Sequence, residues 1–260
     1  MNERPILVTG GAGFIGSNFV HHMISQGKSV ITLDALTYAG SRENLHDVSD
    51  NPLHEFVEGS ISDQALVRNL LVTREPWAIV NFAAESHVDR SIEGPAAFVD
   101  SNIVGVFVLL ETFQKFIATR GQAEFRFLHV STDEVYGSAD EEAFHESTAY
   151  APNSPYAASK AAADHLTRAW HKTYGLPTII TNCSNNYGPY QFPEKLIPLL
   201  ITKALEEQPL PVYGDGKQRR DWLHVSDHCR GLQMALESGR PGETYNIGFG
   251  QDVENLHVVH

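Results

Sequence analysis

Three glycines near the amino terminus constrain the fold of this chain more than any other feature. Gly10, Gly13 and Gly16 lie in the stretch TGGAGFIGS, between an apolar segment and a helix-like segment. This spacing permits a tight strand-to-helix turn and lets a pyrophosphate approach the backbone at the helix N-terminus. Asp34 follows Gly16 by 18 residues, where a carboxylate can accept both ribose hydroxyls of adenosine and repel a 2′-phosphate. The pattern predicts binding of NAD rather than NADP. The alternatives are a glycine turn used for geometry alone and a solvated Asp34.

Short apolar runs alternate with longer amphipathic segments along most of the chain. Strands are expected at 5–9, 29–33, 56–57, 78–84 and 125–131, and helices at 14–26, 64–73, 98–119, 155–174 and 195–207. This alternation predicts an α/β protein built on a doubly wound parallel Rossmann sheet. Beyond Ile180 the sequence becomes richer in Asn, Tyr, Pro and Gly. We therefore expect an NAD-binding domain over residues 1–181, which carries the catalytic residues, and a smaller substrate-binding portion over 182–260.

The composition argues against several classes of protein. The 260 residues carry a formal net charge of -13, which disfavours a nucleic-acid surface. We find no run of about 18 uncharged apolar residues and expect no transmembrane helix. The amino terminus lacks the layout of a signal peptide. Cys183 and Cys229 form no CxxC pair and suit a reducing compartment. We expect a cytoplasmic protein that binds neither nucleic acid nor a membrane.

A tyrosine and a lysine share one face of a well-delimited helix. Ser154 can cap this helix, Pro155 occupies its first position and Gly175 follows its last turn. Tyr156 and Lys160 stand four residues apart within it. An ammonium group near a phenol stabilises the phenolate, so we expect Lys160 to lower the pKa of Tyr156 toward that of a useful general base. Taken alone, the pair is also compatible with surface packing.

Three polar residues occupy the end of the strand expected at 125–131 and the positions after it. Thr132 lies where α/β sheets open toward their ligands, and its hydroxyl can hold the oxygen that Tyr156 deprotonates. Asp133 and Glu134 follow directly. They form either a solvated turn or an acid and a base that act on two substrate atoms, provided that their environments separate their pKa values. The residues alone leave both interpretations open.

These motifs together resemble a known family. The glycine stretch, the YxxxK of Tyr156 and Lys160 and the preceding Thr132 are similar to an extended short-chain dehydrogenase/reductase. A narrower resemblance, to the dTDP-glucose 4,6-dehydratases, rests on DALTYAG at 34–40, NFAAESHVDRSI at 81–92, STDEVYG at 131–137, SPYAASKAAADHL at 154–166, NCSNNYGPYQFPEKLIP at 182–198 and DW at 221–222. It covers nearly the whole chain. Epimerases and decarboxylases share the glycines and YxxxK, so the Asp-Glu pair discriminates.

The resemblance implies a hydro-lyase that converts dTDP-glucose to dTDP-4-dehydro-6-deoxy-glucose and water, with NAD as a transient hydride acceptor. Tyr156, assisted by Lys160 and Thr132, takes the proton of the glucose 4-hydroxyl as hydride leaves C4. Glu134 then removes the C5 proton while Asp133 protonates the departing 6-hydroxyl. Hydride returns to C6, and Glu134 gives its proton back to C5. The product would enter deoxysugar biosynthesis, such as that of dTDP-rhamnose. The alternatives are another NAD-dependent nucleotide-sugar epimerase, dehydratase or decarboxylase, and a catalytically impaired NAD-binding fragment.

The resemblance also implies the binding residues. Those expected to contact NAD are Gly10, Gly13, Phe14, Ile15, Gly16, Asp34, Ala35, Leu36, Thr37, Ser60, Ile61, Phe82, Ala83, Ala84, Glu85, Ser86, Ser101, Tyr156, Lys160 and Asn186. Those expected to contact the nucleotide sugar are Ser86, Thr132, Asn185, Lys195, Leu196, Pro211, Val212, Tyr213, Arg220 and Asn255. Arg220 lies in the basic cluster GDGKQRRDW and can grip a pyrophosphate bidentately; the alternative is a solvated charge. A homodimer is implied through the helices at 98–119 and 155–174.

The chain departs from the family pattern in three places. Ser60 precedes Ile61 where the family usually has an aspartate, so weaker binding of adenine is expected. The segment between Gly137 and Tyr156 is shorter than in many relatives. The sequence stops at His260, where the family continues, which leads us to expect an incomplete substrate-binding portion.

A metal site is a further possibility, because His224 and His228 are spaced as helical ligands would be, close to Asp227 and Cys229. The segment DWLHVSDH, however, predicts a strand followed by a helix that Ser226 caps. The two imidazoles would then not share one helical face. No metal is therefore expected.

Overall fold

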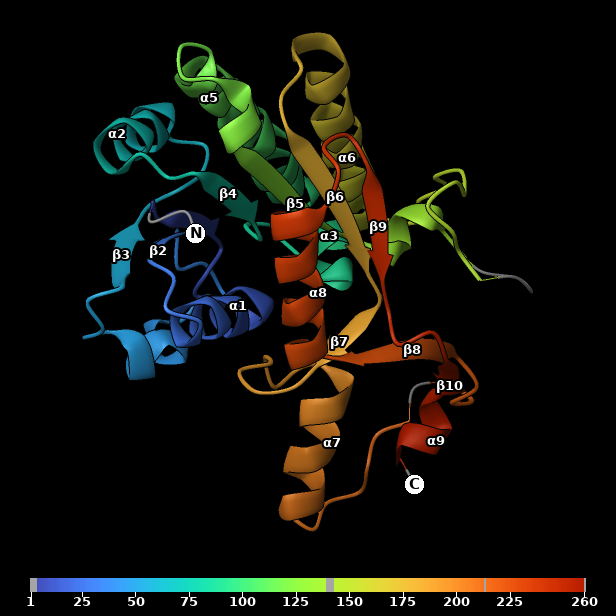
Figure 1. Ribbon diagram of the computed structural model, residues 1–260. Helices are drawn as coiled ribbons and strands as arrows, with labels where there is room; N and C mark the ends of the chain where they lie inside the picture. The colour runs from blue at the N-terminus through green and yellow to red at the C-terminus, as the bar shows by residue number, and fades with distance from the viewer. Residues whose placement is uncertain (1–3, 139–142, 213, 260) are drawn as a thin grey trace.

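The computed structural model describes residues 4–138, 143–212 and 214–259 (Figure 1). Its centre is a seven-stranded parallel sheet with the order β3-β2-β1-β4-β5-β6-β9. The strands are β1 (Ile6–Thr9), β2 (Val30–Asp34), β3 (His54–Glu58), β4 (Ala78–Asn81), β5 (Arg126–Thr132), β6 (Thr178–Cys183) and β9 (Thr244–Ile247). From β1 the chain first adds β2 and β3 on one side, and then returns to the centre and adds the other strands on the opposite side, beginning with β4. In such doubly wound folds, ligands bind at the carboxyl ends of the strands near the point between β1 and β4 where the strand order reverses. The predicted Rossmann architecture is confirmed.

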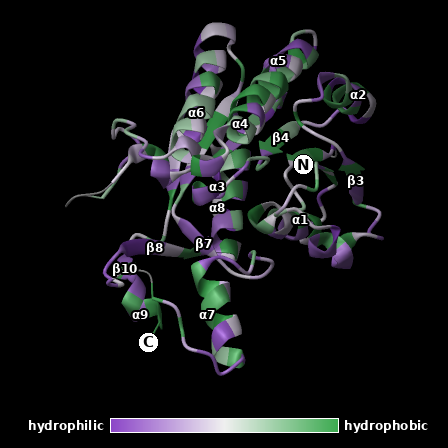
Figure 2. Cartoon of the chain, turned by 180° about the vertical axis from the view of Figure 1, so that it is seen from behind, coloured by the Kyte–Doolittle hydropathy of each residue, from purple (hydrophilic) through white to green (hydrophobic). Residues whose placement is uncertain are grey.

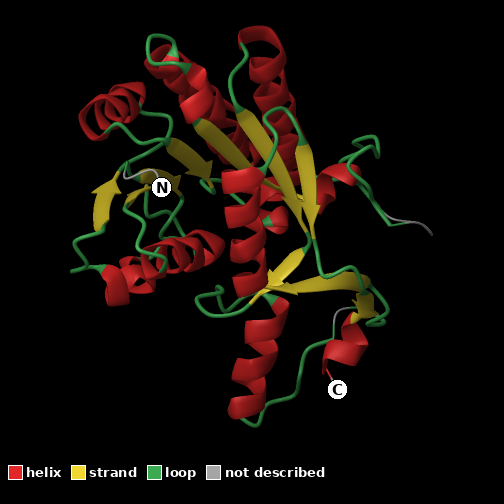
Figure 3. Ribbon diagram, in the orientation of Figure 1, coloured by secondary structure: helices red, strands yellow, loops and turns green. Residues whose placement is uncertain are grey.

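Helices cover both faces of this sheet (Figure 3). On one face, α1 (Phe14–Ser25) and α8 (Val225–Ser238) pack on alternate residues of the strands, such as Ile6 and Val8. On the other face, α2 (Gln64–Arg74), α5 (Val106–Ile117) and α6 (Pro155–Tyr174) pack on Leu7 and its neighbours. Side chains alternate between the two faces of a strand, so a strand buried on both faces is apolar throughout. All four residues of β1 and all five of β2 are buried.

The apolar helix expected at 98–119 is interrupted. It consists of α4 (Pro95–Phe98), a wider π-helical stretch, η2 (Val99–Gly105), and α5. The whole segment, Pro95–Ile117, is long and apolar enough to cross a membrane by length and composition, contrary to the expectation from the uninterrupted apolar runs. Half of its most apolar window is buried inside this structure. Figure 2 shows α5 with its hydrophobic residues among the other helices, and packing against α2 and α6 accounts for its composition.

The carboxy-terminal part forms a second, smaller sheet before the chain returns to the first. Strands β7 (Asn185–Tyr187), β8 (Arg219–His224) and β10 (Asp252–Glu254) pair in the order β10-β8-β7. With α7 (Leu196–Leu205) and α9 (Asn255–Val259) they lie below the main sheet in Figure 1. Between them the chain re-enters the main layers as α8 and β9. The division of the chain at residue 181 stays a prediction.

Short elements complete the described chain: α3 (Val88–Glu93), η1 (Arg42–Val48), η3 (Gln122–Glu124) and η4 (Asp133–Tyr136). The cap predicted for α6 is confirmed, because Ser154 Oγ accepts the N–H of Ala157 at 3.0 Å and Gly175 ends the helix with a φ of 70°. The cap predicted for α8 is wrong by two residues. His224, rather than Ser226, precedes that helix, and its ring accepts the N–H of Ser226.

Candidate active site

The glycine turn joins β1 to α1 at the carboxyl end of the sheet. Gly10 has a φ of 69°, and a Cβ there would lie 2.5 Å from the backbone nitrogen of Ala83, in the segment that follows β4. A Cβ on Gly16 would collide with the carbonyl oxygen of Gly10. Gly13 precedes α1 without a side-chain cap. The first N–H groups of α1 are therefore not covered by a capping side chain, which suits an anion such as a pyrophosphate.

Asp34 ties this turn to the loop after β2. One carboxylate oxygen accepts the N–H of Ala12 and the other accepts the N–H of Leu36, each at 2.8 Å. Burial raises the pKa of Asp34, and these two hydrogen bonds oppose the rise because they favour the carboxylate. Each oxygen has a second lone pair. The geometry leaves Asp34 able to accept from ribose hydroxyls, as the sequence predicted.

The segment after β4 is anchored by a residue that the sequence analysis missed. Asn102 accepts the N–H of Glu85 at 2.8 Å, donates to the Glu85 carbonyl oxygen at 2.9 Å and donates to Ser159 Oγ at 2.8 Å. Asn102 is buried within the π-helical stretch η2. A lone asparagine in an otherwise apolar helix was the available signal, since a buried amide needs partners. Through it, the segment after β4 is fixed to α6.

The remaining predicted NAD contacts also lie in turns at the carboxyl ends of the strands or close to them in the chain. Phe14 and Ile15 open α1, Ala35, Leu36 and Thr37 follow β2, Ser60 and Ile61 follow β3, Phe82, Ala83, Ala84, Glu85 and Ser86 follow β4, and Ser101 lies in η2. Asn186 belongs to β7 and is buried, with its side-chain oxygen 2.9 Å from Nδ1 of His228. The sheet topology thus gathers residues from six chain segments.

Thr132 and the two carboxylates occupy the end of β5 and the short helix η4. The Thr132 hydroxyl accepts the N–H of Glu134 at 3.3 Å and donates to a carboxylate oxygen of Asp133 at 3.4 Å. Burial, and then the charge of Glu134, raises the pKa of Asp133 to about 6. Loss of hydration also raises the pKa of Glu134, although its side chain is still exposed, and the charges of Arg220 and Lys195 lower it. Adjacent carboxylates in different environments can divide the roles of acid and base.

Tyr156 is buried beside this pair, close to the Thr132 side chain. Burial raises the pKa of Tyr156 well above its usual value, and the charge of Glu134 adds to the rise. This differs from the expectation that Lys160 lowers it. The buried Lys160 Nζ donates to the carbonyl oxygen of Val130 at 2.8 Å. In this structure the carboxylates, rather than the lysine, dominate the electrostatics of the phenol.

Apart from Ser86 and Thr132, the predicted substrate residues come from the smaller sheet, its helices and the segments between them. Arg220 lies in β8 and Lys195 directly precedes α7, and the charges of both act on Glu134. Asn185 is in β7, Leu196 begins α7, Pro211 and Val212 lie between α7 and β8, and Asn255 begins α9. Tyr213 lies outside the described residues. The structure therefore brings two cations near the carboxylate pair.

Among the residues that the structure describes, no group of three or more His, Cys, Asp or Glu side chains is arranged to hold a metal ion. His228 is fully buried and directed at Asn186, while His224 contacts the Ser226 hydroxyl.

Comparison with known proteins bears directly on this arrangement. A family model described as GDP-mannose 4,6 dehydratase matches residues 7–260. The chain belongs to that family. A dTDP-glucose 4,6-dehydratase of Xanthomonas campestris pv. campestris (strain B100) is 61% identical over 257 residues, which cover 97% of this chain and 73% of that relative.

Solved structures of dehydratases share the fold. One is the dTDP-glucose 4,6-dehydratase DesIV of Streptomyces venezuelae, solved with NAD and a second ligand bound. It superposes on this chain with a TM-score of 0.91 at 50% sequence identity, and the match covers 98% of this chain and 79% of the DesIV chain. A dTDP-glucose 4,6-dehydratase of Bacillus anthracis in complex with NAD gives a TM-score of 0.90 at 49% identity, with coverage of 98% and 79%. The predicted membership of the dehydratase family is confirmed.

Proposed function

We propose that this chain is a dTDP-glucose 4,6-dehydratase, a hydro-lyase that removes water from the sugar of a nucleotide sugar. The observation that carries the proposal is the carboxylate pair, Asp133 and Glu134, placed beside the buried Tyr156 and given different environments. Relatives at 54–61% identity carry that name. A dehydrogenase that only oxidised the sugar would need no second acid-base pair.

NAD is the cofactor, and the chain fits it. The uncapped start of α1 would receive the pyrophosphate, and Asp34 would accept from the adenosine ribose. The close approach of Gly10 to Ala83 leaves no room for a side chain in the turn that would hold it. Bound NAD would supply a hydride acceptor for C4 of the sugar and a hydride donor for C6, and would not be consumed over a turnover.

Thr132 and Tyr156 act on the first oxygen. The Thr132 hydroxyl, which lies close to the phenol, holds the sugar 4-hydroxyl in place, and Tyr156 takes the proton of that hydroxyl. Because burial and Glu134 keep the phenol protonated in this structure, deprotonation depends on positive charge brought near it. Lys160, one turn further along α6, is the cationic residue of this helix that is closest to Tyr156 in the sequence.

Asp133 and Glu134 act on the next two atoms. With a pKa near 6, Asp133 retains its proton more readily than an ordinary aspartic acid, so it is suited to protonate the departing 6-hydroxyl. Glu134 is more exposed, and two nearby cations favour its charged form, so it is suited to remove the C5 proton. The different surroundings of the two carboxyl groups thus suit Asp133 to the role of the acid and Glu134 to that of the base.

Lys195 and Arg220 provide the positive charge expected around a nucleotide diphosphate. Both lie on the smaller sheet and its helix, outside the Rossmann layers, and both act on the charge of Glu134. A sugar bound between the carboxylate pair and these cations would present its diphosphate to the guanidinium of Arg220. The assignments of all substrate and cofactor contacts are part of this proposal.

The test is Glu134→Gln, with Glu124→Gln as the matched control. Glu124 is exposed and precedes β5 at the opposite end of the strand. Mass spectrometry after incubation with dTDP-glucose and NAD should find a product lighter by one water with the wild type and with Glu124→Gln. Loss of a positioned base should slow Glu134→Gln by about 10²–10⁴-fold. Water elimination at the wild-type rate in Glu134→Gln would contradict the role of Glu134. An unchanged mass with an inverted sugar carbon would instead identify an epimerase.

We also infer a homodimer formed through the outer faces of η2, α5 and α6. Val104, Phe107 and Tyr174 are exposed large apolar side chains on these elements, and such clusters mark association surfaces. Light scattering should give the mass of two chains, and Phe107→Glu should shift it toward one. A wild type that stays monomeric at micromolar concentration would contradict this inference.

Cys183 and Cys229 are both buried free thiols, which fits a protein of the reducing cytoplasm.

A further inference from the structure

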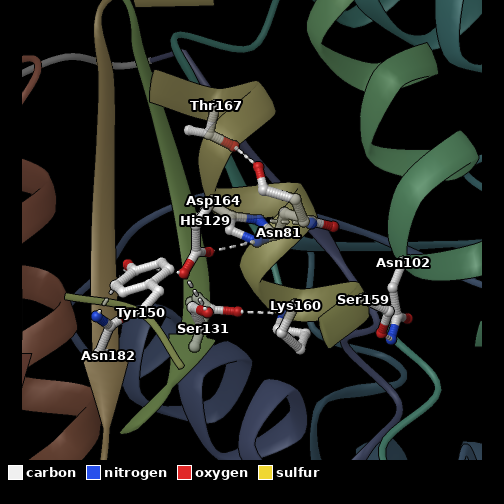
Figure 4. Close-up of polar contacts among 12 residues, drawn as sticks. Asn81, Asn102, His129, Ser131, Tyr150, Ser159, Lys160, Asp164, Thr167 and Asn182 are labelled. Atoms are coloured by element: carbon white, nitrogen blue, oxygen red, sulfur yellow. Dashed lines mark hydrogen bonds and ion pairs between the residues drawn. The ribbon is translucent and has the colours of Figure 1, made fainter. Parts of the chain in front are cut away.

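A buried aspartate lies one helical turn beyond Lys160 and has no role in the scheme above. Asp164 is 1% exposed and stands on the same face of α6 (Figure 4). One of its carboxylate oxygens accepts hydrogen bonds from Ser131 Oγ at 2.9 Å and from the Tyr150 hydroxyl at 3.0 Å. A buried charge is costly unless it is paired and hydrogen-bonded. Burial of the Asp164 carboxyl therefore costs stability, and packing alone does not explain why an aspartate occupies this position.

A row of hydrogen bonds approaches the other oxygen from the opposite side. The Thr9 hydroxyl donates to Asn81 Oδ1 at 2.5 Å, so the amide nitrogen of Asn81 is turned toward Nδ1 of His129, 3.1 Å away. Nδ1 then accepts, and in a neutral imidazole the proton must be on Nε2. Nε2 lies 3.4 Å from the free oxygen of Asp164. All members of the row are fully buried or nearly so.

The row has a direction. Thr9 donates to Asn81 and Asn81 donates to His129, while Ser131 and Tyr150 donate to one oxygen of Asp164. His129 Nε2 and the other oxygen of Asp164 lie 3.4 Å apart, and neither atom has a hydrogen-bond partner among the described residues. Two donors thus bond one oxygen of Asp164, and the N–H of a neutral imidazole lies beside the other, an arrangement that favours a carboxylate over a carboxylic acid.

Few other charges reach Lys160. Burial lowers the pKa of Lys160, and the charge of Asp164 is the leading influence that raises it again. Cys183, which also faces Lys160, has its pKa raised to about 12 by burial and is a neutral thiol near pH 7. His129 has its pKa lowered well below the usual value, by burial and then by Lys160, and is neutral as well. The negative charge that faces the ammonium therefore comes from Asp164.

We propose that Asp164 is a positioning residue that keeps Lys160 an ammonium ion, and that the row from Thr9 through Asn81 to His129 keeps Asp164 ionised. The inference rests on the proposed function, in which the cation beside Tyr156 promotes deprotonation of the phenol. The inference adds Thr9 on β1, Asn81 on β4 and His129 on β5 as residues that govern the charge of the candidate site without touching the substrate.

The pKa of Asp164 lies near neutral pH, so the dependence of the charge of Lys160 on Asp164 can be measured. Burial raises the pKa of Asp164 to about 7, against the charge of Lys160 and the hydrogen bonds of Ser131 and Tyr150. Loss of one donor would therefore reduce the ionised fraction near neutral pH. Tyr136, which shares Asn182 with Tyr150, is a further titratable group near Asp164.

The experiment compares the pH profiles of kcat for the wild type, Asp164→Asn and Tyr150→Phe. Asparagine preserves the shape but removes the charge, so Lys160 should lose its proton at lower pH. We expect the alkaline limb to move down by about one pH unit or more, with kcat at pH 8 reduced about tenfold and KM changed little. Tyr150→Phe removes a donor and keeps the carboxylate, so its alkaline limb should move less. Superimposable profiles of the wild type and Asp164→Asn would overturn the proposal.

A second measurement needs neither activity nor a variant. In ¹⁵N-histidine NMR spectra of the wild type, His129 should stay neutral with its proton on Nε2 between pH 6 and about 9. A proton on Nδ1, or an imidazolium at neutral pH, would overturn the row and with it the ionisation assigned to Asp164. If the wild type formed no dehydrated product, the proposed function would fail, and this spectrum would still decide the inference. If Asp164→Asn did not fold, the profile of Tyr150→Phe and this spectrum would decide together.

Discussion

Gly10 and Gly27 offer a matched pair for testing the glycine turn. Both adopt left-handed backbone conformations, with φ of 69° and 72°. A Cβ on Gly10 would lie 2.5 Å from Ala83 N and 2.7 Å from the carbonyl carbon of Phe82, whereas a Cβ on Gly27 meets no atom within 4 Å. Alanine at the two positions therefore incurs the same conformational cost. Only Gly10→Ala adds a collision between β1 and the segment after β4.

The expected magnitudes follow from these distances. A left-handed alanine costs about 1–2 kcal/mol, and this is the whole loss expected for Gly27→Ala. Ordinary contacts of a Cβ begin at 3.4 Å, so the backbone at Ala83 must retreat by nearly an ångström in Gly10→Ala. Forcing atoms into a packed site costs about 1–3 kcal/mol more. Gly10→Ala should therefore lower the free energy of unfolding by about 2–5 kcal/mol in total.

Urea denaturation and calorimetric titration with NAD measure the two consequences. Because the turn that Gly10 forms would receive the pyrophosphate, Gly10→Ala should weaken NAD binding about tenfold or more, equivalent to about 1.4 kcal/mol. Gly27 follows α1 at its far end, and Gly27→Ala should bind NAD as the wild type does. Equal losses of stability and equal NAD affinities in the two variants would refute the steric argument.

Two further predictions concern Asp133 and Ser154. The pKa of Asp133 rises from 3.8 to about 6 on folding, so the folded protein loses stability relative to the unfolded chain as the pH rises through that window. Asp133→Asn removes this loss. Urea denaturation should find the variant more stable than the wild type by about 1–2 kcal/mol at pH 7.5, and equally stable below pH 4. The same difference in stability at both pH values would contradict the raised pKa of Asp133. Ser154 Oγ accepts the N–H of Ala157, so Ser154→Ala should lower the free energy of unfolding by about 1 kcal/mol, and Ser154→Asp should restore most of it. A melting temperature unchanged in Ser154→Ala would argue against the cap.

Local patterns predicted the layers of this protein well. Five of the seven strands of the main sheet, and the helices α1, α2, α6 and α7, were expected within a few residues of their observed bounds. These elements have apolar periodicity or explicit end signals, such as Ser154 and Gly175 around α6. The strands β6 and β9 were both missed. In β9, four residues of intermediate burial carry little periodic signal and depend on β6 for their pairing.

The candidate site was predicted as a set of residues but not as an electrostatic arrangement. Helical spacing places Lys160 on the same face as Tyr156, yet the hydrogen bond from its Nζ goes to Val130, on a strand thirty residues earlier in the chain. Asp164 is four residues beyond Lys160, but its donors come from β5 and from the loop at Tyr150. Burial and tertiary partners set these pKa values, and neither is visible in local sequence. The interruption at η2 depends likewise on the long-range bonds of Asn102.

The late arrival of β9 has a consequence for the newly made chain. Its register pairs Ile180 with Thr244, so β6 leaves the ribosome well before its outer neighbour. At about 5–20 residues per second, the interval is roughly 3–13 seconds. During that time β6, whose six residues are all buried in the finished protein, presents unpaired backbone groups along one side. Nascent chains of this protein therefore pass through a period in which they can pair with one another. We expect a chaperone that shields apolar strands to raise the yield of native protein most when it acts before residue 247 is translated.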